Sequence, residues 1–306
     1  MPILNVFQSI SSGSKLILVL LAFSLAYSCA EEPKRKKDEG EKKEEKKEKQ
    51  NSNLFEIEGK VFSIPSPIQT AFLLKNSGAS YSSDLLNPTG NVANYVTKSK
   101  KALNLGVFGA NLGYATIYDQ TQDAISYMAV TKRLSSELGI ANLFDEAMIV
   151  RFESNLGDQD SLLALVSDAF KKADGFLKEN KQNDLSVLIL AGGWVETLHF
   201  ATNLSETTDN QDIRNRIGEQ KITIKNLINL LLPFQENQEV GNVLNQLNEL
   251  KDLYADIGFT YTYQESTTDE ENKLTSINSE SKVDMTDDQL QNIVTKVDEI
   301  RNTIIK

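Results

Sequence analysis

From residue 66 onward, apolar residues recur three and four positions apart, the spacing that places them on one face of an α-helix. This spacing predicts helices over the following ranges: 66–77, 91–119, 121–138, 142–155, 159–180, 184–204, 211–232, 237–257 and 287–305. Ser66 and Pro67 suit an N-cap and a first helical position. Thr286 followed by Gln289 predicts a capping box at the start of the last helix.

Two of these segments are apolar on most of their faces. Residues 185–195 contain no charged residue, which indicates a helix that other helices surround. Residues 222–232 are similar but include Lys225, so we expect that helix to pack against two neighbours.

One stretch alternates instead of following the helical period. Phe259, Tyr261 and Tyr263 are separated by threonines, which predicts a β-strand. We expect residues 274–285 to pair with it across an acidic turn, and residues 55–64 to add an edge. The predicted fold is therefore all-α: an irregular antiparallel helical bundle, or a stack of helical hairpins, of about seven to eight helices with a small β-hairpin near the C-terminus.

The N-terminus has the pattern of a targeting segment, and residues 1–28 are predicted to be a lipoprotein signal peptide. The uncharged run 16–27 is ~18 Å long as a helix, well short of the ~30 Å apolar core of a bilayer. Cys29, the single cysteine, follows in the sequence Leu-Ala-Tyr-Ser-Cys, which resembles a bacterial lipobox. We expect Cys29 to carry acyl chains that anchor the protein in a membrane. The alternative is a secreted protein with a free thiol.

Residues 29–53 are predicted to form the lipidated cysteine and a disordered, charged tether. Residues 30–50 contain no aliphatic residue larger than alanine, so they bury too little surface to offset the entropy of ordering. Within 41–49, most pairs four positions apart carry like charges, which opposes a helix. A single helical domain is then expected over residues 54–306.

Charge narrows the choice of partners. The 306-residue chain has a formal net charge of −11, and residues 1–53 carry ten Lys or Arg against eight Asp or Glu, which leaves −13 on residues 54–306. Nucleic-acid backbones and anionic lipid surfaces repel such a domain, so nucleic acid is excluded as a partner. One Cys excludes a disulfide framework, and one His excludes sites that need two imidazoles. No cofactor is expected.

Glu196 and His199 are the candidate metal ligands. Their spacing places a carboxylate and an imidazole on adjacent turns of one helix face, a unit that di-iron sites in helical bundles use. A carboxylate from Asp119 or Asp123 would complete a mononuclear site. The favoured alternative is a hydrogen-bonded histidine near the end of a buried helix, because the pattern supplies no fourth ligand for structural zinc.

A mixture of aromatic and polar residues defines a candidate ligand pocket. Its members are Tyr114, Tyr118, Asp119, Asp123 and Trp194. Aromatic rings supply contact area in such pockets, and polar groups orient the ligand. The same mixture is expected at a corner between two helices that supplies its own caps, which is the interpretation that we favour.

Glycines occur at helical spacing within two predicted helices. Gly106, Gly109 and Gly113 share one face of the first, and Gly192 and Gly193 lie inside the second. A glycine inside a helix costs ~0.5–1 kcal/mol relative to alanine, so several of them indicate a close approach of backbones. We predict that these two helices cross at their glycines. A phosphate-binding loop would require a preceding strand, which neither cluster has.

Two stretches carry a resemblance to a known group of proteins. KALNLGVFGANLGYATIYDQTQDAISYMAVTKRLSSELGI (101–140) and LILAGGWVETLHFATN (188–203) resemble uncharacterised helical lipoproteins of Bacteroidetes-type bacteria, and the resemblance covers most of residues 60–255. It implies a location in the cell envelope but no activity, cofactor or catalytic residue. Glu31 and Glu32 are similar to the signal that sends such lipoproteins to the cell surface.

These patterns lead to three hypotheses about function. The first is a membrane-anchored lipoprotein of the bacterial cell envelope whose helical domain is an interaction or scaffolding module for an envelope protein. We expect it at the outer rather than the inner membrane, with the cell surface as a further location. The second is a solute-binding lipoprotein with a pocket between helices, and the third is a metal-dependent enzyme that uses Glu196 and His199.

Overall fold

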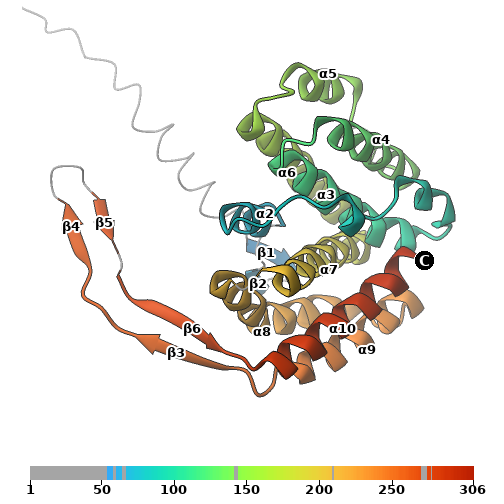
Figure 1. The fold of residues 1–306 in the computed structure, drawn as a ribbon. Helices are drawn as coiled ribbons and strands as arrows, with labels where there is room; N and C mark the ends of the chain where they lie inside the picture. Colours follow the sequence, from blue (N-terminus) through green and yellow to red (C-terminus); the bar gives the residue numbers. More distant parts are fainter. Residues whose placement is uncertain are drawn as a thin grey trace, which may run out of the picture. The chain divides into compact units, whose positions relative to one another are not determined.

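Helices make up most of the structure, a computed structural model that describes residues 54–57, 60–63, 67–140, 144–208, 210–269, 274–276 and 278–306 (Figure 1). These residues belong to one compact unit, Glu48–Lys306. The predicted signal peptide, Cys29, the tether before residue 54 and the Ser66 cap lie outside the described residues.

The predicted all-α class is confirmed, and the described ranges contain nine α-helices, one in each of the nine predicted ranges, against the seven to eight expected for the bundle as a whole. They are α2 (Pro67–Asn76), α3 (Lys98–Ile117), α4 (Thr121–Glu137), α5 (Glu146–Ser154), α6 (Gln159–Glu179), α7 (Asn183–Thr207), α8 (Gln211–Leu231), α9 (Gln238–Leu253) and α10 (Asp287–Ile305). The predicted capping box of α10 is present: the Thr286 side chain accepts from the Gln289 amide, and the Gln289 side chain accepts from the Thr286 amide.

The helix that the apolar spacing predicts over 91–119 begins several residues later in the structure. Residues Thr89–Asn94 form a separate 3₁₀ helix, and α3 begins at Lys98. The cause is the cap: Thr97 has extended backbone angles, and its hydroxyl accepts a hydrogen bond from the Lys100 amide at 3.1 Å. A threonine in this conformation ends the preceding segment and starts a new helix.

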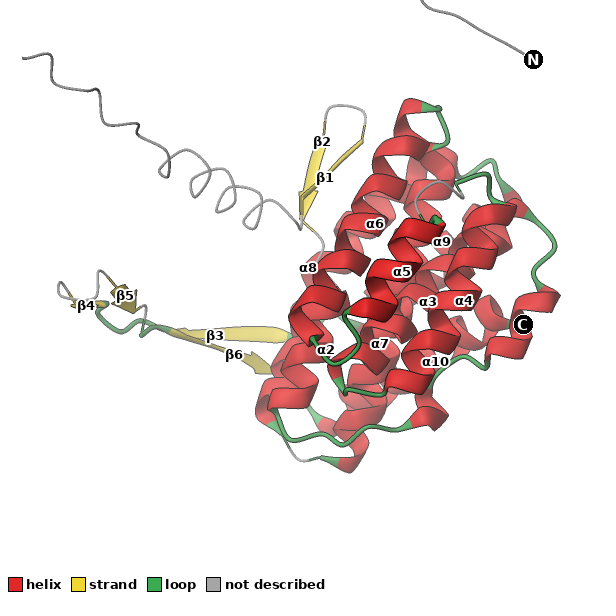
Figure 2. Cartoon of the chain, turned by 90° about the horizontal axis from the view of Figure 1, so that it is seen from above, coloured by secondary structure: helices red, strands yellow, loops and turns green. Residues whose placement is uncertain are grey.

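Helix α7 lies at the centre of the bundle, as its uncharged sequence predicts. It packs against α2, α3, α6, α8 and α10 (Figures 1 and 2). By length and composition α7 could cross a membrane, but 94% of its most apolar window is buried within the protein. Such burial is typical of a core helix, because the neighbouring helices supply the apolar surroundings that a bilayer would otherwise provide.

The predicted crossing of the two glycine-containing helices is confirmed. A Cβ added at Gly106 would lie 1.9 Å from the Ile189 carbonyl oxygen of α7, and one added at Gly192 would lie 1.9 Å from the Leu103 carbonyl oxygen of α3. Only glycine permits backbones at this separation. Gly109 has a different role, since its Cβ would meet the ring of Phe170 on α6 at 2.2 Å.

In the part of the chain that the structure describes, the strands form three separate antiparallel pairs. Their bounds are β1 (Leu54–Ile57), β2 (Lys60–Ser63), β3 (Gly258–Thr262), β4 (Thr267–Asp269), β5 (Leu274–Ser276) and β6 (Glu280–Asp284). Strand β3 pairs with β6 and β4 with β5, so the predicted hairpin near the C-terminus is confirmed. The expected edge from residues 55–64 is wrong: β1 and β2 pair with each other. Two residues separate these strands, so local pairing closes a much shorter loop than pairing with β3.

Candidate functional site

Glu196, a candidate metal ligand, is fully buried and pairs with an arginine. Arg301 on α10 donates from Nε to Glu196 Oε2 at 2.8 Å and from Nη2 to Oε1 at 3.1 Å. Asn111 on α3 donates to Oε1 at 2.6 Å. Both carboxylate oxygens are therefore used, and this two-point geometry is the strong form of an arginine–carboxylate pair.

The same pair holds the loop before α3 against the bundle. Arg301 Nη2 also donates to the Leu85 carbonyl oxygen at 2.8 Å. The Asn87 amide donates to Asn111 Oδ1 at 3.0 Å, and Tyr127 of α4 donates to the Asn87 carbonyl oxygen at 3.1 Å. Buried polar groups need such partners, so this network fixes the path of the loop.

His199, the second candidate ligand, is also buried and pairs with α10 one turn away from Arg301. Its Nδ1 lies 2.8 Å from Asp298 Oδ1. An ionised carboxylate only accepts, so Nδ1 is the donor in this contact. The hydrogen bond from His199 lowers the pKa of Asp298. His199 Nε2 is buried without a hydrogen-bond partner among the described atoms.

These contacts assign Glu196 and His199 to two polar links between α7 and α10. Neither Asp119 nor Asp123 joins them: Asp119 pairs with Lys75, and Asp123 accepts from Tyr81. Within the residues that the structure describes, no group of three or more His, Cys, Asp or Glu side chains could hold a metal ion. The geometry favours the hydrogen-bonded histidine, the alternative interpretation of this motif.

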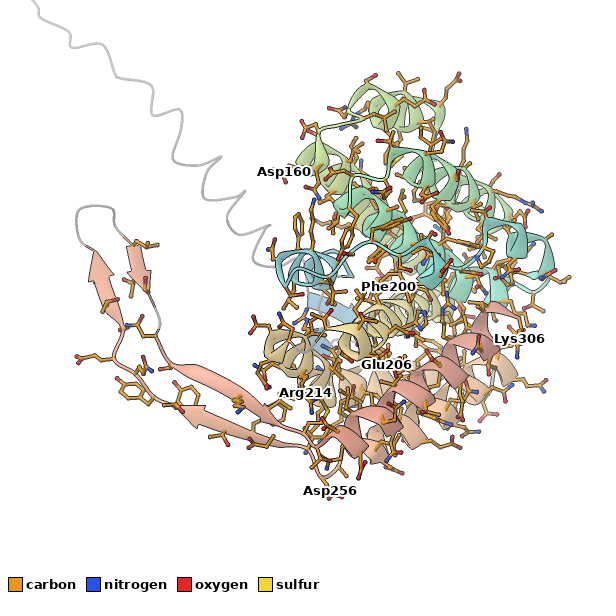
Figure 3. All side chains as sticks on the ribbon, in the orientation of Figure 1. Asp160, Phe200, Glu206, Arg214, Asp256 and Lys306 are labelled. Atoms are coloured by element: carbon orange, nitrogen blue, oxygen red, sulfur yellow. The ribbon has the colours of Figure 1, made fainter. Side chains whose placement is uncertain are left out.

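Tyr114 and Tyr118, from the candidate pocket, belong to an aromatic stack. Their ring centroids are 4.7 Å apart, and the Tyr114 ring lies 5.3 Å from Tyr81 and 4.6 Å from Phe200. Phe200 is labelled in Figure 3. Tyr118 donates to the Ala79 carbonyl oxygen at 2.9 Å. Burial raises the pKa of Tyr114 and of Tyr118 above the ordinary value for tyrosine.

Asp119 lies at the corner between α3 and α4. Its φ of 58° is left-handed, a conformation that aspartate tolerates better than most residues. Lys75 Nζ donates to Asp119 Oδ2 at 2.9 Å and to the Ile117 carbonyl oxygen at 2.6 Å. A cation at this helix end satisfies carbonyl groups that have no partner within the helix. The residues thus form a helix corner, as the favoured interpretation predicts, but its cap comes from Lys75 of α2 and not from the corner itself.

Trp194, the last member of the candidate pocket, faces a different group of residues. Its indole nitrogen donates to Gln220 Oε1 of α8 at 2.9 Å, and it lines a small cavity of about 10 Å³ with Thr70 and Gln220. A larger open groove, of about 500 Å³, lies between α2 and α8. Phe72, Arg216 and other residues of these helices line that groove, and the predicted pocket residues do not.

The long hairpin between α9 and α10 extends beyond the helices, and we call it the arm, residues 258–284 (Figure 2). Its two strand pairs are joined by side-chain hydrogen bonds. The Gln264 amide donates to Ser279 Oγ at 3.1 Å, and Asn278 Nδ2 donates to the Glu265 carbonyl oxygen at 2.7 Å. Polar side chains thus bridge the gap between the two ladders.

One face of the arm carries aromatic side chains that become more exposed with distance from the helices. Phe259 is 41% exposed, Tyr261 64% and Tyr263 74%. Phe259 pairs with Val283, and Tyr261 pairs with Ser281. Residues opposite each other in an antiparallel pair share a face, so Val283 and Ser281 lie beside the rings of Phe259 and Tyr261.

The base of the arm is fixed to α8. Val283 is buried, and a Cβ added at Gly218 would lie 2.3 Å from its Cγ1. Asn215 Oδ1 accepts from the Val283 amide at 3.1 Å, and Arg214, labelled in Figure 3, donates to the Met285 carbonyl oxygen at 3.0 Å. The arm therefore begins from a defined position on the bundle.

The sequence predicts β3, β5 and β6, but it places β4 within the acidic turn and does not identify the arm as a candidate site. The composition of the second strand indicates that the aromatic row has few apolar neighbours within the arm. Residues 278–284 contain a single apolar residue, Val283, whereas residues 259–263 carry three aromatic residues at alternate positions. Helix α8 covers this face at Val283, and the rings of Tyr261 and Tyr263 farther along the arm lie largely in solvent.

Comparison with known proteins found no relative of this chain. No family model matches the chain, no curated protein matches it, and no solved structure matches it.

Proposed function

We propose that this chain is a lipid-anchored interaction module of the bacterial cell envelope, and that the arm is the part that contacts a partner protein. Cys29 would carry the acyl anchor, and residues 30–53 would separate the anchor from the helical domain. The observation that carries the proposal is the exposed aromatic row of the arm.

The exposed row is large for a two-stranded element. Phe259, Tyr261 and Tyr263 together leave roughly 300–400 Å² of aromatic surface open, given side-chain areas of 150–250 Å² and their exposed fractions. Isolated hairpins are marginally stable in water, and contiguous apolar patches of this size commonly mark contact sites. A partner that covers the row would stabilise the arm and gain most of its binding energy from a few aromatic side chains.

The sequence before residue 54 supports the membrane anchor. The single cysteine of the chain follows a short apolar run, and 24 residues separate Cys29 from Leu54. As a flexible coil, this length has an average reach on the order of 25–30 Å. An arm held within that distance of a membrane would meet other envelope proteins at high effective concentration.

The anchor is tested by growing cells with an alkyne analogue of palmitate. We expect the wild-type chain to incorporate the label and Cys29→Ser to lose it, because the thiolate is the acylated atom. The location is tested by fractionation, where the wild type should sediment with outer membranes. An unlabelled wild-type chain would contradict the anchor.

The interaction module is tested in the same cells with a photo-crosslinking amino acid at position 263. The matched control places it at Val96, which is 80% exposed and lies outside the arm. We expect a crosslinked protein adduct from position 263 and none from position 96. A chain that is always recovered without an adduct, or equal adducts at both positions, would contradict the role of the arm.

A second candidate function, solute binding, is favoured by the groove between α2 and α8. Arg216 donates to Thr70 Oγ1 from Nε at 3.2 Å and from Nη2 at 3.1 Å, so its guanidinium group is held at the groove wall. Phe72 supplies apolar surface beside it. A thermal-shift screen of small solutes tests this role, since a ligand at 100 times its Kd raises stability by about 2.7 kcal/mol. Arg216→Gln should abolish any such shift.

A further inference from the structure

The outer edge of β3 has backbone groups without a strand partner. Within the described residues, β3 hydrogen-bonds to β6 alone, and no strand lies along its other side. Open edges of this kind accept additional strands unless charged side chains or prolines protect them. Residues 258–264 contain neither a charged residue nor a proline, whereas β6 carries Lys282 and Asp284. The unprotected edge of the arm is therefore the β3 edge.

The aromatic row lies along the same strand as the open edge. A strand added beside β3 would place its own side chains opposite Tyr261 and Phe259, at the spacing of a cross-strand pair. Main-chain hydrogen bonds would supply affinity, and alternate side chains against the rings would supply selectivity. Since β6 offers only Val283 and Ser281 on this face, the rings remain available to the added strand.

The charge of the arm selects the chemistry of the partner. Residues 258–284 contain six Asp or Glu and two Lys, a net charge of −4. A basic segment is attracted to this surface, and an acidic one is repelled. A second copy of the chain is disfavoured because both arms are acidic. The exposed row also offers roughly half of the ~800 Å² per partner that a stable dimer buries.

We propose that the β3 edge binds a positively charged, extended segment of a partner protein, which adds to the arm as a third strand. The proposal deepens the interaction-module function and rests on it. It names the contact surface, Gly258–Tyr263, and the kind of partner: alternating apolar residues that face the rings, with Lys or Arg between or beside them.

The probe is a library of random decapeptides displayed on phage, selected against the purified full-length chain in detergent. We expect the enriched peptides to alternate apolar and polar residues and to carry net positive charge. A synthetic copy of an enriched peptide should bind the double variant Tyr261→Thr/Tyr263→Thr about tenfold or more weakly, because truncated aromatic contacts dominate such interfaces. Threonine retains strand propensity, and circular dichroism checks the fold. The control variant is Val96→Thr, which should bind like the wild type.

Amide hydrogen exchange on the wild-type complex tests strand addition without any substitution. Bound peptide should slow exchange at alternate amides of β3, those that face away from β6. Three outcomes would overturn the proposal: no enriched peptide, enriched peptides that are neutral or acidic, or protection outside β3. Concentration-dependent dimerisation that the tyrosine substitutions abolish would assign the edge to a second copy instead. These results do not depend on acylation, so failure of the anchor and failure of the strand-binding edge are distinguishable.

Discussion

At the scale of single residues, Glu196 and Arg301 matter most because they form a buried ion pair between α7 and α10. The Glu196 side chain is fully buried and the Arg301 side chain is 10% exposed. Removing two charges from water is costly, and the cost is offset only when every donor and acceptor is paired. Asn111 and the Leu85 carbonyl oxygen add two further hydrogen bonds to the pair here.

Glu196→Gln should destabilise the protein by about 3–5 kcal/mol, because it leaves the Arg301 guanidinium buried without a counter-charge. Urea unfolding followed by circular dichroism measures this change. The matched control is Lys172→Ala, which removes an exposed i,i+4 pair with Asp168 and should cost less than about 1 kcal/mol. Equal losses in the two variants would mean that the buried pair has no special structural role.

Gly106 offers a second residue-scale test, with Gly175 as its control. Gly106→Ala should destabilise by about 1–3 kcal/mol, since its Cβ has no space beside the Ile189 carbonyl oxygen. Gly175 lies within α6, and no atom lies within 4 Å of an added Cβ. Gly175→Ala should therefore stabilise by about 0.5–1 kcal/mol through helix propensity alone. Thermal unfolding compares the two, and a change of the same sign in both would refute the crossing argument.

At the scale of elements, the helices were predictable because their apolar residues repeat at one period and their ends carry capping residues. The stripe of α10 illustrates this: Leu290, Ile293 and Val297 follow the predicted spacing, and all are buried. Arg301 was not predicted as buried. An arginine beside an apolar stripe ordinarily extends toward water, and its partner Glu196 lies 105 positions away in the chain.

The position of the arm on the helices depends on the close packing of Gly218 in α8 against Val283 in β6. Gly218→Ala should loosen the base of the arm, because the new methyl group would overlap Val283. We expect faster proteolysis within residues 258–284, with the helical circular dichroism unchanged. Gly218→Ala/Val283→Ala relieves the overlap and should restore part of the protection. If the double variant is cleaved faster than Gly218→Ala, the close packing of these two residues is not what holds the arm.

At the scale of the whole molecule, the central position of α7 followed from composition, whereas the exposure of the arm did not. An uncharged helix needs apolar neighbours on every side, so residues 185–195 had to lie inside. Alternation in Phe259–Tyr263 predicts a strand with an apolar face, but whether a neighbour covers that face depends on the rest of the fold. The cap of the corner at Asp119 could not be predicted from the local sequence either, because Lys75, which supplies it, comes from a different helix.

The free energy of unfolding of the whole molecule should also decrease at alkaline pH, because buried tyrosines keep their phenol protons in the folded state and release them in the unfolded chain. Burial raises the pKa of Tyr254, Tyr114 and Tyr95 above the ordinary value of about 10. Above pH 10 the unfolded chain has released these protons while the folded chain retains them, so unfolding becomes easier as pH rises. The stability from these groups is complete below pH 10 and decreases above it. Fully buried Tyr254 contributes at most about 1.4 kcal/mol per pH unit.

Urea midpoints between pH 8 and pH 11.5 measure this dependence. Tyr254→Phe is the informative variant because it removes one buried phenol together with its 3.1 Å hydrogen bond to the Ile217 carbonyl oxygen. At pH 8 it should cost about 1 kcal/mol for the lost bond. Above pH 10 its stability should decrease less steeply than that of the wild type, so the two curves converge. Parallel curves throughout the range would show that Tyr254 ionises equally well in the folded and unfolded chains, and would contradict the predicted effect of its burial.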